Sequence, residues 1–403
     1  MIFWMMPDNS TQTQRMMEKF LVDFKKCNPG LTINIKVINR RTLWTRMFTL
    51  KHEIGREGCP DIIAFPHYWT GLLVKANILA NLTELDKSLR VDDCLDPLRP
   101  FCYRKDSTDV YSYPWWTDIT ALHYREDHLK LITDNAEELL STWGGFMQAC
   151  QMLKEHFAGQ EDYYPVQNND WRGSLSYRSA LHCVWGYGAD LFNKEGDVSG
   201  LKDDGFCKGL QDFINLALKG YMPILKERSS TGAISRGKAS IMLTRRQGIG
   251  MFEGNNEASF VVKTLPVPRT GADPINYMSG VNLGIIRGSR DTYAALDLIK
   301  WLTRPEKQVE YASATEVFPA LGGSFESFLL ASPRRIRNYA HIIAGARTMR
   351  NHIASGTVME IVGNIMSKAA SAIVMDKYNP YSLKEELKKA DEEVNNILHL
   401  YNE

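Results

Sequence analysis

The sequence predicts an α/β protein built from two or three lobes. The chain has 403 residues, which is too long for one ordinary hydrophobic core. Apolar residues make up 44% of it and charged residues 24%, as in soluble globular proteins. The N-terminal third alternates between helical and strand-like segments. A β-α-β-α-β order of this kind gives a mostly parallel sheet with helices on both faces.

The first elements follow from hydrophobic periodicity. Met16, Phe20 and Phe24 recur every four residues, so they share one face of a helix. Asn28-Pro29-Gly30 ends that helix, and the next segment alternates apolar and polar residues as a strand does. The expected helices span residues 12–26, 42–52 and 71–77, and the expected strands span 31–37 and 61–65.

The remainder of the chain is richer in helices. Residues 111–124 form an extended run broken by Pro114, which we interpret as a crossover strand between lobes. Pro266 and Pro268 mark a second crossover, and the chain is expected to be helical from Pro319 to its end. No apolar run approaches the roughly 20 residues of a membrane span. Further helices are expected over 205–219, 291–302 and 382–398, and strands over 239–243, 260–262 and 282–286.

Charge and cysteine content exclude several classes of function. A formal net charge of +1 argues against a nucleic-acid partner, which usually requires a basic stripe. The seven cysteines include no CxxC pair and no histidine cluster at zinc spacing, so we expect no metal and no cofactor. They are free buried thiols, or some of them pair in an oxidising compartment. No leader precedes Met1, so the chain is cytosolic or its leader has been removed.

Aromatic residues gather just after several of the expected strands. In an open α/β sheet, ligands bind beyond the carboxyl ends of the strands. A Trp offers a flat apolar face with one polar edge, which suits the C–H face and hydroxyl rim of a sugar. Core packing accounts equally well for any single Trp, and the recurrence favours a binding role. The groups are residues 3–7, 65–69, 113–116, 169–171 and 185–187.

Two catalytic interpretations are weaker than binding. A glycoside hydrolase needs two carboxyl groups about 5 to 9.5 Å apart, and Asp118 with Asp170 could supply them. Carboxylates also accept hydrogen bonds from sugar hydroxyls in binding proteins, so their presence does not discriminate. Gly186-Tyr187-Gly188 lacks the third glycine and the lysine of a phosphate-binding loop.

Seven short motifs in a fixed order resemble the extracellular solute-binding proteins of sugar ABC transporters, the family that includes the maltose-binding proteins. Each motif is weak alone, but their order over nearly the whole chain is specific for the family and not for the sugar. The motifs are residues 2–4, 28–33, 60–63, 113–118 with 123–125, 237–242, 280–285 and 294–305.

The resemblance implies a bilobal periplasmic-binding-protein fold of class II type, with two α/β lobes joined by hinge strands and a ligand in the cleft between them. The expected lobe 1 comprises residues 1–112 and 275–316, and lobe 2 comprises 113–274 and 317–403. It implies a monomeric, non-enzymatic protein that passes a carbohydrate to ABC transporter permease subunits. Its location would be periplasmic or, as a lipoprotein, the cell surface. A ligand-sensing domain of a cytosolic regulator is the alternative, favoured by the missing leader and the free cysteines.

The resemblance also implies which residues contact the ligand, with no catalytic and no metal-binding residues among them. The family's Gly-Pro-Trp, whose Trp stacks on sugar, is replaced here by Thr244-Arg245-Arg246. The Arg245 guanidinium either contacts an anionic group of the ligand or pairs with an Asp of its own lobe. The expected contacts are Trp4, Asp8, Trp44, His67, Tyr68, Trp69, Trp116, Asp118, Asp170, Trp171, Arg245, Ser279, Gly280 and Asn282.

Overall fold

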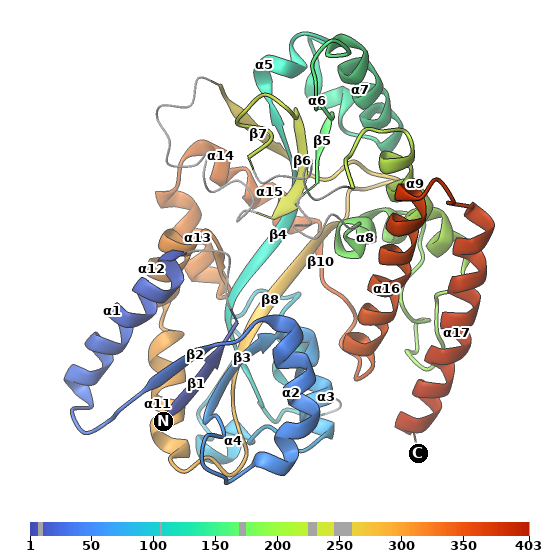
Figure 1. Ribbon diagram of the computed structural model, residues 1–403. Coiled ribbons are helices and arrows are strands. Elements are labelled where there is room, and N and C mark those ends of the chain that lie inside the picture. The colour runs from blue at the N-terminus through green and yellow to red at the C-terminus, as the bar shows by residue number, and fades with distance from the viewer. Residues whose placement is uncertain (7–10, 105–106, 169–174, 225–231, 246–259, 403) are drawn as a thin grey trace. The chain divides into compact units, whose positions relative to one another are not determined.

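The computed structural model describes the whole chain except residues 7–10, 105–106, 169–174, 225–231, 246–259 and 403 (Figure 1). The chain forms two compact units, each assembled from separate stretches. Unit 1 consists of Met1–Asp118, Met278–Pro333 and Thr348–Gly356, and unit 2 of Ile119–Tyr277, Arg334–Arg347 and Thr357–Glu403. Strands β4 (Tyr113–Arg125) and β8 (Asn276–Ile285) each begin in one unit and end in the other.

The sheet of unit 1 is largely parallel, as predicted. Strand β1 (Ile2–Met5) pairs in parallel with β2 (Asn34–Val37) on one side and with β3 (Ile62–Pro66) on the other. All five residues of β3 are buried, which explains its continuous apolar run. On its far side β3 pairs antiparallel with residues 281–285 of β8. The carboxyl ends of β1 and β3 therefore lie at the same edge of the sheet.

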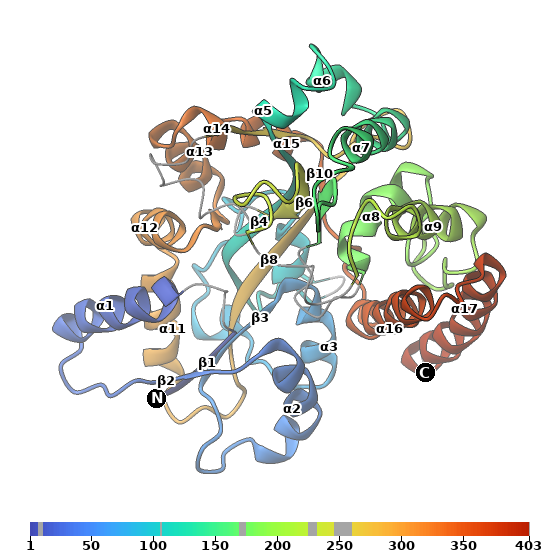
Figure 2. The same ribbon diagram turned by 45° about the horizontal axis from the view of Figure 1, so that its top comes forward.

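Helices cover both faces of this sheet (Figures 1 and 2). On one face lie α1 (Thr11–Cys27), α11 (Thr292–Leu302) and α12 (Pro305–Thr315). Phe20 and Phe24 of α1 pack against Trp301 of α11, with ring centroids 5.4 and 5.7 Å apart, so the predicted apolar face of α1 is confirmed. On the other face lie α2 (Arg40–Glu53) and α3 (Thr70–Lys75). The Asn39 side chain begins α2 by accepting a 2.9 Å hydrogen bond from the Thr42 N–H.

Residues 317–333 group with unit 1, whereas the sequence analysis assigned them to lobe 2. The physical reason is a short strand, β9 (Phe318–Pro319), which pairs with Trp116 and Thr117 of β4 inside unit 1. Phe318 also packs on Phe325 and Phe328 of α13 (Gly322–Ala331). Residues 348–356 join unit 1 as well. Smaller elements of this unit are η1 (His67–Trp69), α4 (Leu82–Leu85) and η2 (Arg99–Cys102).

Unit 2 is built around the second half of β4. This strand pairs antiparallel with β6 (Ile241–Arg245) and β7 (Val262–Leu265), and β5 (Val166–Gln167) pairs in parallel with β6. Helices α8 (Tyr177–Gly186) and α9 (Asp204–Leu218) pack closely at Gly209. The glycine permits this approach, since a Cβ atom there would lie 2.5 Å from the Val184 backbone. The other helices here are α5 (Glu126–Leu129), α6 (Ala136–Leu139) and α7 (Trp143–His156).

The C-terminal part of the chain corrects two expectations. Strand β10 (Ala346–Arg347) interrupts the predicted run of helices and pairs in parallel with Asn276 and Tyr277 of β8. Among the described residues, helix α16 (Ser355–Val374) has the length and apolar composition needed to cross a membrane, with a mean hydropathy of 1.2. Its buried residues recur on one face, as in a core helix, and include Val358, Val362, Ile365, Met366 and Ala369. The other helices are α14 (Arg334–Arg337), α15 (Tyr339–Ala344) and α17 (Pro380–Asn402).

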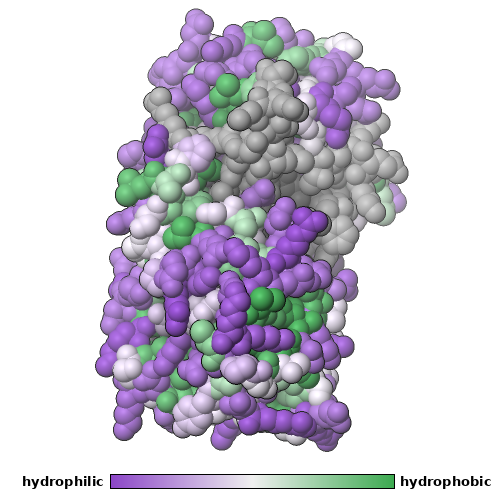
Figure 3. Space-filling model, turned by 90° about the vertical axis from the view of Figure 1, so that its left-hand side faces the viewer, coloured by the Kyte–Doolittle hydropathy of each residue, from purple (hydrophilic) through white to green (hydrophobic). Residues whose placement is uncertain are grey.

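The described residues on the face shown in Figure 3 are mostly hydrophilic. On the face shown in Figure 3, hydrophobic residues form small groups among hydrophilic ones. The large apolar side chains with the highest exposure belong to two helices: Tyr381 and Leu400 of α17 and Leu330 of α13. Single exposed apolar side chains are ordinary on soluble proteins and do not by themselves indicate a partner.

Candidate ligand-binding site

Six rings of unit 1 contact one another in a continuous series, which we call the aromatic row. It runs from the exposed ring of Phe48 to the buried ring of Phe101. Successive ring centroids lie 4.3 to 6.3 Å apart. Edge-to-face and tilted contacts at such distances are favourable for aromatic rings. In order, the row consists of Phe48, Trp44, Trp69, Tyr68, His67 and Phe101.

The sequence places these rings at the carboxyl edge of the sheet. Trp44 and Phe48 are four residues apart on α2 and therefore share one face of that helix. His67, Tyr68 and Trp69 form η1, which follows β3 directly. A Cβ atom at Gly356 would lie 2.9 Å from the Trp44 ring and 3.1 Å from the Trp69 ring, so the glycine permits both indoles to pack there.

Two arginines of α2 contact the aromatic residues of this edge, and the sequence analysis missed both. Arg40 donates a 3.0 Å hydrogen bond from a guanidinium nitrogen to the Tyr68 hydroxyl. The Arg46 guanidinium lies 5.1 Å from the centroid of the Trp4 ring, within cation–π distance. The face of Trp4 is thus covered by a guanidinium, and its buried Nε1 has no hydrogen-bond partner among the described residues. The i, i+4 spacing of Arg40 and Trp44 along α2 was an available signal for Arg40, whereas Arg46, two residues after Trp44, had none.

His67, Gly280 and Asn282 meet in a buried polar network. His67 Nδ1 hydrogen-bonds with the Gly280 backbone at 2.9 Å. Burial lowers the pKa of His67 to about 4, so the ring is neutral at pH 7. Asn282 Nδ2 donates to the Ser112 hydroxyl at 2.9 Å and to the Phe101 carbonyl at 3.1 Å. The network therefore fastens β8 to the loops that carry the aromatic row.

Trp116, Asp118 and Ser279 lie on the two long strands, within unit 1. Trp116 is opposite Pro319 of β9, and Asp118 is fully buried. The Thr117 hydroxyl donates a 2.5 Å hydrogen bond to the Ser279 carbonyl, so β4 and β8 are joined at this point. The Ser279 hydroxyl is buried and has no hydrogen-bond partner among the described residues.

Unit 2 contains Arg245 and an aromatic side chain, Trp185, that was not among the expected ligand contacts. Arg245 ends β6, opposite Thr120 of β4. In α8, Trp185 donates from Nε1 to Asp190 at 3.1 Å, and its ring lies 4.7 Å below the guanidinium of Arg347. Arg347 also forms an ion pair with Asp190. Although the sequence marked residues 185–187 as aromatic, no local pattern connects them with Arg347, which lies 157 positions after Asp190.

Three candidate residues cannot be placed. Asp8, Asp170 and Trp171 lie outside the described residues. The predicted aromatic platform at Trp171 and the carboxylate pair of Asp118 with Asp170 are thus untested. Within the described parts of the chain, no group of three or more His, Cys, Asp or Glu side chains is placed to hold a metal ion.

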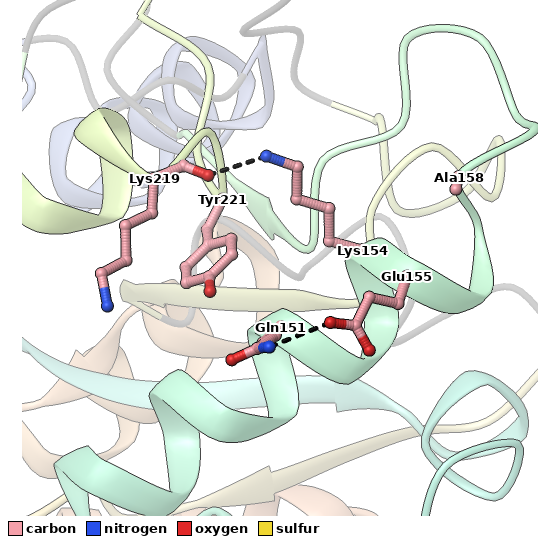
Figure 4. Close-up of a pocket in the computed structure, with 6 residues that line it drawn as sticks. All are labelled: Gln151, Lys154, Glu155, Ala158, Lys219 and Tyr221. Atoms are coloured by element: carbon pink, nitrogen blue, oxygen red, sulfur yellow. Dashed lines mark hydrogen bonds between the residues drawn. The ribbon is translucent and has the colours of Figure 1, made fainter.

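One surface hollow of unit 2 contains none of the candidate residues. It has a volume of about 560 Å³ and lies between α7 and the turn after α9 (Figure 4). Lys154 Nζ donates to the Lys219 carbonyl at 2.8 Å, and Gln151 Nε2 donates to Glu155 at 2.9 Å. With its polar groups paired in this way, the hollow offers one ring, Tyr221, and no second stacking face.

Comparison with known proteins identifies the family. A family model described as bacterial extracellular solute-binding protein matches residues 19–332. The chain belongs to this family. As a solute-binding protein it binds rather than converts its ligand, and the family implies an extracytoplasmic location. A comparison with curated proteins gave no significant match.

Solved structures show the same fold as this solute-binding protein. The GacH receptor of Streptomyces glaucescens is 15% identical, with a TM-score of 0.81 over 99% of this chain and 98% of that one. The sugar-binding protein MalE of Xanthomonas citri is 16% identical, with a TM-score of 0.78 over 100% and 98%. Maltose-bound MalE3 of T. maritima is 18% identical, with a TM-score of 0.80 over 98% and 100%. These likenesses confirm the predicted bilobal α/β fold.

Proposed function

We propose that this solute-binding protein binds a carbohydrate and delivers it to an ABC importer. The observation that carries the proposal is the aromatic row at the carboxyl edge of the unit 1 sheet. Its half-buried Trp44 and exposed Phe48 present apolar rings, and α2 supplies Arg40 and Arg46 beside them. The structural neighbours include a receptor in complex with acarbose and a maltose-bound protein, in agreement with this ligand class.

The chemistry of a sugar fits such a site. Each pyranose ring has apolar C–H faces that pack on aromatic rings and a rim of hydroxyl groups that need hydrogen-bond partners. Arginine side chains supply several donors in a fixed plane. A mixture of flat apolar faces and planar donors is better suited to a saccharide than to a purely apolar or a purely ionic ligand.

We further propose two roles for residues of this site. Trp44 and the α2 arginines contact the ligand directly. His67, Gly280 and Asn282 hold the loops of η1 and η2 in place, because their hydrogen bonds at 2.9 to 3.1 Å join them to groups of unit 1. Arg245, Trp116, Asp118 and Ser279 remain proposed contacts, as do Asp8, Asp170 and Trp171.

The same proposal extends to the transporter partner of the protein and to the compartment in which it works. The ligand-loaded protein docks on the permease subunits of an ABC transporter. It works in the periplasm or as a lipoprotein at the cell surface. No observation on the described residues favours the alternative of a cytosolic regulator.

A thermal-shift screen over mono- and oligosaccharides, neutral and acidic, tests the ligand class. A ligand that binds the native state raises the unfolding temperature, and the stabilisation grows with the logarithm of its concentration once that exceeds the Kd. We expect at least one saccharide to do so at micromolar concentration. A panel in which amino acids, peptides or polyamines stabilise the protein and no saccharide does would contradict the proposal.

A further inference from the structure

Strand β2 and helix α2 give unit 1 a cationic surface. Residues 34–52 contain five lysine and arginine side chains and no aspartate or glutamate. The first carboxylate after them is that of Glu53, the last residue of α2, which accepts a 3.1 Å hydrogen bond from the Thr49 hydroxyl. Crowded like charges destabilise a folded protein, so an anion bound beside them would offset this repulsion. The five cations are Lys36, Arg40, Arg41, Arg46 and Lys51.

Most of these charges have no counter-charge in the described parts of the chain. Exposed cations are ordinary on protein surfaces, so charge alone does not indicate a ligand. An anion site requires in addition a cation that is held in a fixed position and a neighbouring donor that lacks an acceptor. Four of the five cations are exposed and form no ion pair with any residue that the structure describes: Lys36, Arg41, Arg46 and Lys51.

Arg46 is the cation that meets the first of these requirements. Its guanidinium lies 5.1 Å from the centroid of the Trp4 ring, so the indole holds it in place. An aromatic ring orients a guanidinium but leaves its net charge and its N–H donors in place. Arg46 therefore presents a positioned fork of donors, which is the arrangement that binds a carboxylate or phosphate through two parallel hydrogen bonds.

The second requirement is met by Trp4 itself. Trp4 is 1% exposed, and its buried Nε1 has no hydrogen-bond partner among the described residues. A buried donor without an acceptor destabilises the fold. An indole N–H can only donate, and the same is true of the guanidinium of Arg46 beside it. An anionic oxygen, which only accepts, suits two such donors better than a hydroxyl group, which also has a proton to donate.

We propose that the saccharide bound by this protein carries an anionic group, which Arg46 recognises beside Trp4. The inference rests on the proposed function, since it specifies the ligand of the same carboxyl edge of the sheet. Trp44 and Phe48 of the same helix, with ring centroids 5.2 Å apart, supply the apolar faces that a sugar ring needs and a simple anion does not. The other cations of β2 and α2 attract the charged ligand before contact. Uronic acids, sulfated sugars and sugar phosphates share this chemistry.

Matched saccharides test the charge preference of the wild-type protein by titration calorimetry. The pairs are oligogalacturonates and their methyl esters, sulfated oligosaccharides and their desulfated forms, and sugar phosphates and the free sugars. In at least one pair we expect the acidic member to bind about tenfold or more tightly than the neutral one, as a charged hydrogen bond would give. This preference should shrink as NaCl rises from about 50 to about 500 mM. Equal affinities within every pair would overturn the inference and leave the proposed function standing, whereas no binding by any saccharide would contradict the proposed function itself.

Variants test the assignment of the charge preference to Arg46. Arg46→Gln should weaken the acidic member of the preferred pair about tenfold or more and the neutral member about twofold or less. The matched control is Arg290→Gln, whose side chain lines a hollow with Met1 and Asp61 at the amino edge of the same sheet and which should bind both sugars as the wild type does. An unchanged preference in Arg46→Gln would overturn the assignment. Equal weakening of both sugars would overturn it too, because it would indicate a packing role.

Discussion

Trp44 is the residue whose truncation best separates ligand binding from packing. Its ring lies 5.2 Å from that of Phe48 and 5.0 Å from that of Trp69. Loss of two such aromatic pairs, at about 0.5–1.5 kcal/mol each, lowers the free energy of unfolding by about 1–3 kcal/mol. If the ring also stacks on a sugar, Trp44→Ala costs a further ~1–3 kcal/mol of binding free energy, as for other aromatic anchors. That is a weakening of about 5- to 150-fold in Kd.

The matched control is Trp301→Ala. This Trp belongs to the same unit but packs against α1 on the opposite face of the sheet (Figure 2). It is 7% exposed, so its truncation leaves a cavity and costs about 3–5 kcal/mol of stability. We expect unchanged affinity by titration calorimetry in Trp301→Ala and weakened affinity in Trp44→Ala, with urea unfolding reporting the stability of both. Wild-type affinity in Trp44→Ala, or equal losses in the two variants, would refute our assignment of the aromatic row.

Three further predictions concern pH, packing and charge. Three histidines are buried, and desolvation lowers the pKa of each to about 4: His67, His123 and His182. As pH falls, the unfolded state takes up these protons before the folded state does. The free energy of unfolding is therefore highest above the unfolded pKa of about 6.5 and falls as pH drops towards 4, by about 2 kcal/mol per histidine at pH 5. Urea midpoints that do not change between pH 7 and pH 5 would contradict this. Gly209→Ala should lower the free energy of unfolding by about 1–3 kcal/mol, because its Cβ would meet the α8 backbone at 2.5 Å. Gly144→Ala, with nothing within 4 Å, should show no loss in the same urea experiment. Arg245→Met should weaken an acidic saccharide by about 1.5–3 kcal/mol and a neutral one less, and calorimetry showing equal effects would exclude charge recognition by this residue.

The sequence was sufficient for elements with a clear period. The i, i+4 spacing of Phe20 and Phe24 located α1 and its buried face. The continuous apolar run of β3 identified a strand buried on both sides. In both cases the signal is local, because the period of apolar residues reports which face is buried. The placement of His67, Tyr68 and Trp69 at the end of β3 followed from the same strand.

What the sequence could not give is the identity of packing partners. Strand β9 is two residues long and has no period, so the grouping of residues 317–333 with unit 1 was missed. The packing of Trp44 and Trp69 against Gly356, and of Trp185 beneath Arg347, joins residues far apart in the chain. Helix α16 shows a related limit, since an apolar core helix and a membrane span can have similar compositions.

The most direct test of the central claim is calorimetric titration of the wild-type protein with the saccharide that raises its unfolding temperature most, followed by recovery of that saccharide. We predict one saturable site per chain, with a Kd in the micromolar range or tighter, which corresponds to a binding free energy of about −8 kcal/mol or better. The recovered saccharide should be intact, as expected of a protein that binds and releases its ligand. Absence of saturable heat with every neutral and acidic saccharide, or recovery of a cleaved sugar, would contradict the account.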